Sequence, residues 1–315
     1  MFFDTTIRSQ VLGDKLIQKA LEDYRSAGLS EDGLGVTLLL HPQRLTQNGQ
    51  PHRPEGFAYH GQRLFYPCSV VKAFYLVAMD ACLASGQVQP HEDLERAMRD
   101  MIIWSSNTAT NYVIDLITQT TGDTLLSAEE FMVWANRRQA VNRYFQSLDW
   151  PDLADINLCQ KLMDDERYGR EKAFVTFGGN NHNRLCSNAA ARLMFEMFNG
   201  TVASPERCRS MTARFHRPLN AEFAAQPAAQ INGYFGANLP DDATLYSKAG
   251  WTGWTGDPLA SYRRHDLGYI ELPLTHEGHY QAFTLAVFTQ GQAMSEGTEM
   301  LPAFARLAYD TVMAA

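Results

Sequence analysis

A serine and a lysine three residues apart are the first residues of this sequence whose types and spacing are suited to chemistry. Ser69 and Lys72 lie in the stretch 66–74, at the start of a mostly apolar segment that is predicted to form a buried helix. Residues three apart share one face of a helix, so the hydroxyl and the amine can touch. A serine hydroxyl is a weak nucleophile at neutral pH, and a partly desolvated lysine can act as its base. Taken alone, the pair is more typical of a helix cap followed by a solvated lysine than of a catalytic pair.

Two further stretches place polar residues at the ends of predicted elements. Ser105 and Asn107 lie at the junction between two predicted helices, and Lys248 ends a predicted strand beside the small residues Ala249 and Gly250. Taken singly, the serine and the asparagine are ordinary helix caps, and a lysine is common on an edge strand. Their chemical meaning therefore depends on whether the fold brings them to Ser69.

The elements expected to position these residues fall into an outer and a middle set. The outer set consists of a helix at 11–27, strands at 35–40, 56–60, 245–248, 266–272 and 281–288, and a closing helix at 297–313. The middle set consists of helices at 69–85, 93–104, 108–118, 128–148 and 188–198. Hydrophobic periodicity and flanking turn residues support these assignments. The segment 149–187, which includes the charged run 164–167, lacks a regular pattern and is long enough to suggest a functional part whose role the sequence does not give.

These elements predict an α/β protein with an inserted all-α lobe. Its antiparallel sheet should be flanked by the N- and C-terminal helices, because both ends of the chain supply strands to one layer. We expect a single domain over 1–315, with an α/β lobe formed by 1–66 and 235–315 and a helical lobe formed by 67–234.

The composition is that of an ordinary globular protein and argues against a nucleic-acid partner. Hydrophobic residues make up 45% and charged residues 20%, and the net charge is -8 without a basic patch. No segment is apolar enough to span a membrane, and the first eight residues lack a signal-peptide pattern. Five cysteines without metal-ligand spacing predict reduced thiols in a cytoplasmic protein, with an exported mature form left open.

We expect no metal and no cofactor. The run His276-Glu277-Gly278-His279 lacks the helical spacing that places two zinc ligands on one face, and it is predicted to be a polar hairpin turn. The oligomeric state is not indicated by the sequence.

In chain order, the three stretches resemble the Ser-x-x-Lys, Ser-Asp-Asn and Lys-Thr-Gly motifs of class A β-lactamases and penicillin-binding proteins. The stretches 65–69, 106–111 and 238–240 are similar to the flanks of these motifs in that family, and the resemblance extends from Leu12 to Tyr309. It implies the β-lactamase/transpeptidase-like fold and a serine hydrolase that forms an acyl-enzyme.

The resemblance also implies a role for each matching residue. Ser69 would be the acyl-accepting nucleophile, and Lys72 its base or part of the proton relay. Ser105 would pass a proton to the leaving group, and Asn107 would orient Lys72 and the acyl amide of the substrate. Lys248 would supply positive potential for Ser105 and for an anionic group of the substrate.

The oxyanion hole and the substrate-binding edge would come from the residues around the third motif. The backbone N–H groups of Ser69 and Trp251 would form the oxyanion hole, which suits a helix N-terminus at the nucleophile. Gly250, Trp251 and Thr252 would contact the substrate.

The chain departs from the family pattern within its motifs. Ser106 replaces the aspartate of the second motif, a mainly structural position. Ala249 replaces a hydroxyl that helps to hold a substrate carboxylate, and Thr252 could substitute only if the strand edge bends inward. The segment between Ser69 and Ser105 is shorter than in class A enzymes, so one wall of the pocket should be reduced.

The most consequential departure concerns release of the acyl group. Class A enzymes carry a loop glutamate that activates the deacylating water, and the corresponding loop here, 148–157, has none. Asp152 and Asp155 are the candidate deacylation bases, although aspartate is also a common turn former. We therefore expect an acyl-enzyme at Ser69 with a β-lactam, an amide or an ester, and leave the turnover of β-lactams open.

Three functions remain open at this stage. The first is a class A β-lactamase-like serine hydrolase. The second is a cytoplasmic esterase, peptidase or biosynthetic hydrolase on the same fold. The third is a catalytically inactive binding module, which the presence of all five polar motif residues disfavours.

Overall fold

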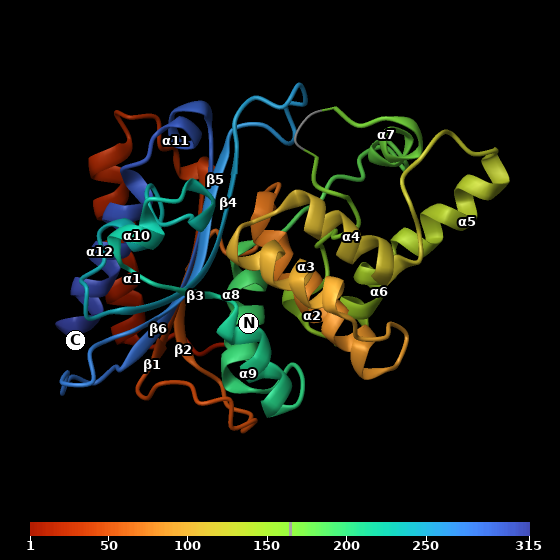
Figure 1. The fold of residues 1–315 in the computed structure, drawn as a ribbon. Helices are drawn as coiled ribbons and strands as arrows, with labels where there is room; N and C mark the ends of the chain where they lie inside the picture. The colour runs from red at the N-terminus through yellow and green to blue at the C-terminus, as the bar shows by residue number, and fades with distance from the viewer. Residues whose placement is uncertain (164–165) are drawn as a thin grey trace.

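A six-stranded antiparallel sheet divides the molecule into two unequal halves (Figure 1). The structure is a computed structural model that describes residues 1–163 and 166–315, so Asp164 and Asp165 of the charged run lie outside the described residues. The strand order is β2-β1-β6-β5-β4-β3. The strands are β1 (Leu34–His41), β2 (Glu55–Tyr59), β3 (His216–Arg217), β4 (Thr244–Thr252), β5 (Arg263–Glu271) and β6 (Ala282–Gln290). The pairing of β1 with β6 joins the two ends of the chain in one layer, as predicted.

Both faces of the sheet are buried, and alternate residues of each strand serve the two sides. Leu38 of β1 and Val287 of β6 belong to the hydrophobic cluster shared with the terminal helices. Leu39 and Phe288, the next residues along the chain, belong to the cluster shared with the helical lobe. This explains why the central strands are apolar without an alternating polar pattern.

Helices from the two ends of the chain lie on one side of the sheet, and a helix from the middle of the chain packs against the other side. On one side of the sheet lie α1 (Ile7–Tyr24), α11 (Gln292–Glu296) and α12 (Met300–Met313), and on the other side α8 (Ser187–Asn199) packs against β1, β5 and β6 (Figure 1). The remaining α-helices are α2 (Lys72–Ala84), α3 (Glu92–Ile103), α4 (Asn107–Thr118), α5 (Ala128–Arg138), α6 (Ala140–Ser147), α7 (Gly169–Val175), α9 (Pro205–Ala213) and α10 (Ala221–Ala224). The predicted α/β fold, with a sheet between terminal helices and an inserted helical part, is confirmed. The strand β3 falls inside the segment 67–234, so that segment also contributes to the sheet edge.

The prediction of one helix at 128–148 is wrong. Helix α5 ends at Arg138, and α6 begins at Ala140, after Gln139 adopts φ -78° and ψ 4°. The two helices pack into different clusters: Trp134 of α5 contacts the rings of α7, whereas Phe145 of α6 packs edge-on against a ring of α2. A straight helix could not place both rings in their clusters, and the sequence pattern alone did not show that there were two.

The described residues contain no helix long and apolar enough to cross a membrane. All five cysteines are free and buried.

Candidate active site

Ser69 lies on a tight turn that leads into the buried helix α2. The 3₁₀ turn η2 (Cys68–Val71) precedes α2, so the α-helix begins at Lys72 and not at Ser69, contrary to the prediction. The backbone N–H of Lys72 donates to the carbonyl of Ser69, which keeps the two side chains on one side of the turn. Cys68 has φ 48°, a left-handed conformation that is uncommon for residues other than glycine. Ser69 is partly exposed and lines a cavity of about 500 Å³.

Lys72 connects the nucleophile turn to the second motif. Its side chain is fully buried, and Nζ donates to Asn107 Oδ1 at 2.8 Å, to Ser105 Oγ at 3.2 Å and to the Ser105 carbonyl. Ser105 has φ 53° in the short link between α3 and α4. Ser106, the residue that replaces the family aspartate, accepts the N–H of Ala109 at 3.1 Å and caps α4. Ser106 therefore stabilises the start of α4.

Lys248 approaches the same hydroxyl from the sheet. Its Nζ donates to Ser105 Oγ at 3.0 Å, to the Ala249 carbonyl at 2.8 Å and to Gln230 Oε1. The side chain is fully buried, and burial, followed by the positive charges of Lys72 and Arg217, lowers the pKa of Lys248 well below its usual value. Two ammonium groups thus donate to one hydroxyl. Their mutual repulsion favours the loss of a proton from the cluster of Lys72, Ser105 and Lys248.

Strand β4 touches the nucleophile turn directly at Gly250. A Cβ atom at this position would lie 2.8 Å from the backbone nitrogen of Ser69 and 2.9 Å from the carbonyl oxygen of Pro67. These neighbours are backbone atoms that cannot swing away, so glycine is required here for the close approach.

The two residues after Gly250 form one wall of the cavity. Trp251 donates its indole N–H to the carbonyl of Ser295 at 2.9 Å, and Thr252 donates its hydroxyl to the carbonyl of Ala260 at 2.8 Å. Thr252 does line the cavity, and its hydroxyl is also 3.6 Å from Cys68 Sγ. Ala249 directs its methyl group to the opposite side, into the cluster shared with the terminal helices.

Arg217 is a site residue that sequence reasoning missed. It is fully buried in β3 and donates to the carbonyls of Ile102 and Ile103 at 2.7 and 3.0 Å and to the carbonyl of Ser247 at 3.0 and 3.2 Å. It thereby ties the end of α3 to β4, next to the residue Lys248. Burial lowers the pKa of Arg217 to about 10.

His265 is a second residue that was not identified from the sequence. It fixes the backbone at Tyr66, three residues before the nucleophile Ser69. Its Nδ1 accepts the backbone N–H of Thr289 at 3.0 Å, so Nε2 carries the proton and donates to the carbonyl of Tyr66 at 2.9 Å. Burial lowers the pKa of His265 to about 3, which keeps the ring neutral. Gln230, beside the turn η4 (Pro227–Ala229), was also missed. In each case the partner is distant in the sequence, so no local spacing could have found it.

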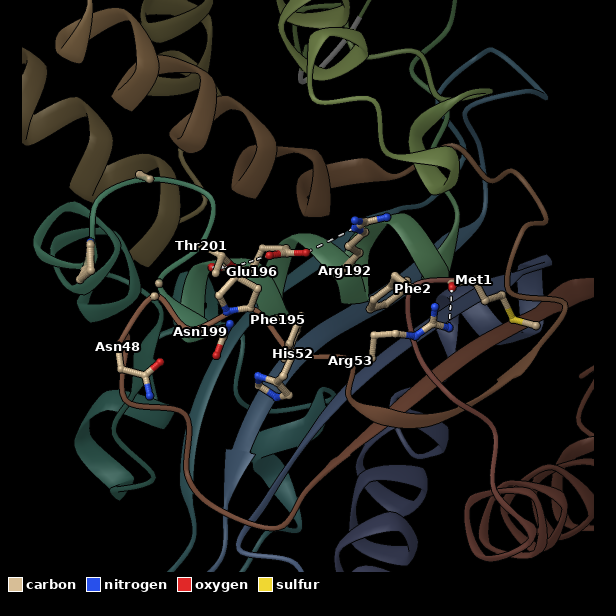
Figure 2. A pocket seen from close by; sticks show the side chains of 15 residues that line it. Met1, Phe2, Asn48, His52, Arg53, Arg192, Phe195, Glu196, Asn199 and Thr201 are labelled. Atoms are coloured by element: carbon tan, nitrogen blue, oxygen red, sulfur yellow. Dashed lines mark hydrogen bonds and ion pairs between the residues drawn. The ribbon is translucent and has the colours of Figure 1, made fainter.

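The two candidate deacylation bases lie away from the Ser69 cavity. Asp152 is buried and forms an ion pair with Arg192 of α8, Oδ2 to Nη1 at 2.9 Å. Arg192 also stacks over Trp150 and lines a separate cavity of about 750 Å³, shown in Figure 2. Asp155 is exposed, and neither carboxylate lines the Ser69 cavity. The structure therefore gives no support to the assignment of these two residues, because Asp152 is paired with the partly buried Arg192 and Asp155 is exposed.

Among the described residues, those lining the Ser69 cavity include no carboxylate and no other charged side chain. Asn107 and Thr252 supply polar groups, and Leu162 and Met163 of the segment 149–187 supply an apolar side. The buried charges of Lys72 and Lys248 lie behind this lining.

Several solved β-lactamase structures are similar to this one over nearly the whole chain. A β-lactamase from Sphaerobacter thermophilus DSM 20745 superposes with a TM-score of 0.64 at 19% identity, covering 96% of this chain and 97% of that chain. A class A representative from Bacteroides cellulosilyticus DSM 14838 gives 0.64 at 17% identity, with 96% and 99% covered. A β-lactamase from Xanthomonas campestris pv. campestris str. ATCC 33913 gives 0.61 at 17% identity, with 96% and 98% covered. At such low identity these similarities establish the fold.

Comparison of the sequence with family models establishes the family. A search of curated proteins finds no match. The model described as the beta-lactamase enzyme family matches residues 93–312, a segment that includes Ser105, Asn107 and Lys248 and begins after Ser69 and Lys72. Because this match covers more than half of the chain, the protein belongs to the beta-lactamase enzyme family and is a β-lactamase-like hydrolase.

Proposed function

We propose that this protein is a serine hydrolase that forms an acyl-enzyme at Ser69. The observation that carries the proposal is the convergence of two buried lysines on Ser105 Oγ, beside a serine on a tight turn at the cavity wall. Buried cations of like charge cost free energy, and the surroundings that lower the pKa of Lys248 favour the loss of a proton from this cluster.

In the acylation step, Ser69 Oγ attacks the carbonyl carbon of an amide, an ester or a β-lactam. The proton of Ser69 passes to Lys72, and Ser105 conveys a proton to the departing nitrogen or oxygen as the bond between it and the carbonyl carbon breaks. The backbone N–H groups of Ser69 and Trp251 stabilise the oxyanion. The contact between Gly250 and the Ser69 nitrogen supports this arrangement, because it holds the strand edge against the turn.

In the deacylation step, water adds to the acyl carbon, the bond to Ser69 Oγ breaks, and the acid is released. We propose that the cluster of Lys72, Ser105 and Lys248 also takes the proton of this water. We expect this step to be slow relative to acylation, because both lysines already donate to Ser105 Oγ.

The test is covalent labelling followed by mass spectrometry of the intact protein. A fluorophosphonate probe and a penicillin should each be offered to the wild type, to Ser69→Ala and to Ser26→Ala, an exposed serine that serves as the control. Phosphonylation of the wild type and of Ser26→Ala, but not of Ser69→Ala, is the expected result. If the probe does not label Ser69, the nucleophile assignment fails, and the alternative of an inactive binding module returns.

A nitrocefin assay then separates acylation from turnover. We expect a burst of about one equivalent per enzyme followed by a slower steady rate, since slow deacylation leads to accumulation of the acyl-enzyme. Fast linear hydrolysis from the first turnover would contradict the proposed slow step.

A further inference from the structure

Every proton of the Lys248 ammonium group already has an acceptor in the protein. An ammonium group has three N–H donors and no acceptor. In this structure they point to Ser105 Oγ, the Ala249 carbonyl and Gln230 Oε1, and the side chain has no exposed surface. A substrate carboxylate could gain a hydrogen bond from Lys248 only by displacing one of these oxygens.

The hydroxyl nearest to this edge of the strand is also committed. Thr252 donates its only hydroxyl proton to the carbonyl of Ala260 at 2.8 Å. Ala249 offers no hydroxyl, and its methyl group lies in the hydrophobic cluster on the other side of the sheet. An anionic group in the cavity would therefore lose its hydration without finding a charged side chain among the described lining residues, and the guanidinium of Arg167 beside the cavity is already hydrogen-bonded to Tyr66.

The same cavity has a broad aromatic and apolar rim. Trp251 and Trp254 both line it, with 49% and 61% of their surface exposed, and Tyr66 closes its inner end. Leu162 and Met163 belong to the same lining. Exposed tryptophans that border a cavity are typical of a surface that binds a large apolar group.

We propose that this site selects neutral acyl donors, esters or amides with an aromatic or other apolar acyl group and no carboxylate, and that Gln230 and Trp254 determine this selectivity. The inference rests on the proposed acyl-enzyme at Ser69. Gln230 disfavours anions, without excluding them, because its amide oxygen takes the Lys248 proton that a carboxylate would need. Trp254 supplies the exposed ring against which the acyl group packs.

A matched pair of phenyl esters tests the exclusion of anions. The meta-carboxyphenyl ester of phenylacetic acid carries a carboxylate, and the corresponding methyl-esterified compound has a methyl group in place of that charge. Release of the phenol gives kcat/KM for each compound. We expect the wild type to prefer the neutral ester by at least about tenfold, because the carboxylate would be desolvated without a partner.

Two variants test the residues. Gln230 has φ 56°, so Gln230→Asn is the suitable substitution: asparagine tolerates this conformation, and its shorter side chain withdraws the amide from Lys248. It should reduce the preference for the neutral ester by about fivefold or more, since a charge-assisted hydrogen bond becomes available to the carboxylate. Trp254→Ala should lower the ratio of kcat/KM for phenylacetyl over acetyl esters by about threefold to tenfold, as one aromatic contact is lost. Leu274→Ala, which removes an exposed apolar side chain from the turn between β5 and β6, should leave both ratios unchanged.

The outcomes separate the inference from the proposed function. If phenol release does not depend on Ser69, shown by equal rates for the wild type and Ser69→Ala, the proposed function fails and the inference falls with it. If release depends on Ser69 but the wild type prefers the carboxylate-bearing ester, only the inference is overturned. Unchanged selectivity in both Gln230→Asn and Trp254→Ala would also overturn it, and Trp254→Ala changes an exposed residue whose loss does not threaten folding.

Discussion

Asp266 is a buried carboxyl group whose protonation should make the stability of this protein depend on pH. It lies in β5, where its two oxygens accept the backbone N–H groups of Phe235 and Leu267 at 3.0 and 2.9 Å. Burial raises the pKa of Asp266 from 3.8 to about 7, against the opposing effects of these hydrogen bonds and of the positive charges of Lys248 and Arg217. The folded protein therefore binds a proton at a pH at which the unfolded chain has released it.

The size and sign of the effect follow from these two pKa values. Because the folded pKa of Asp266 lies above the unfolded one, its contribution to stability is fully present below the unfolded pKa and is lost as the pH rises through the folded one. Linkage with these values gives a loss of about 2 to 3 kcal/mol in the free energy of unfolding between about pH 5 and about pH 8. The substitution Asp266→Asn removes the titration and leaves a constant cost of about 1 to 3 kcal/mol, because one backbone N–H then faces an amide NH₂.

The assay is urea unfolding followed by tryptophan fluorescence at about pH 5 and about pH 8, with the linear extrapolation applied at each pH. The free energy of unfolding of Asp266→Asn minus that of the wild type should become more positive by about 2 to 3 kcal/mol from the lower to the higher pH. Asp310→Asn, at an exposed ion pair on α12, controls for the loss of a surface carboxylate. A difference that stays constant within about 0.5 kcal/mol across this range would refute the elevated pKa of Asp266.

Three further predictions follow from residues around the site. Gly250→Ala should reduce the acylation rate by about a hundredfold, because the new methyl group forces the Ser69 turn away from the strand; stopped-flow acylation at the wild-type rate would contradict this. Arg217→Met should lower the free energy of unfolding by about 3 to 5 kcal/mol and raise the pKa of Lys248, moving the pH profile of acylation upward; an unshifted profile would deny the electrostatic link. His265→Phe should cost about 2 to 4 kcal/mol in urea unfolding, since two buried backbone groups lose their partner, and a cost under about 0.5 kcal/mol would mean that water replaces the ring.

The parts of the site that could be predicted from the sequence are those with local spacing. Ser69 and Lys72 are three residues apart, so their proximity follows from helix geometry, whereas Ser105 and Asn107 are close because they lie on either side of Ser106, the N-cap residue of α4. The structure brings Lys72 and Asn107 into hydrogen-bond contact, and it places Lys248 against Ser105. Their catalytic roles remain proposals.

The residues that escaped prediction act through partners far along the chain. Arg217 donates to the carbonyl groups of Ile102 and Ile103, which lie more than one hundred positions before it. It also donates to the carbonyl of Ser247, thirty positions after it. Gln230 reaches Lys248 from a separate short turn, and nothing in its neighbourhood distinguishes it from an ordinary surface glutamine. Asp152 is the converse case: its loop position suggested a deacylation base, but its carboxylate is paired with Arg192 and does not line the Ser69 cavity.

The two lysines and the serine between them also bear on the missing glutamate. Ser105 Oγ has one proton and accepts from both Lys72 and Lys248 when both are charged. When one lysine is neutral, Ser105 accepts from the charged lysine and donates to the neutral one, so a proton can cross between them in either direction. The same relay that takes a proton from Ser69 during acylation can therefore take one from water during deacylation. If the proposed acyl-enzyme forms, we expect this relay to release the acyl group without the loop glutamate, but more slowly than it forms.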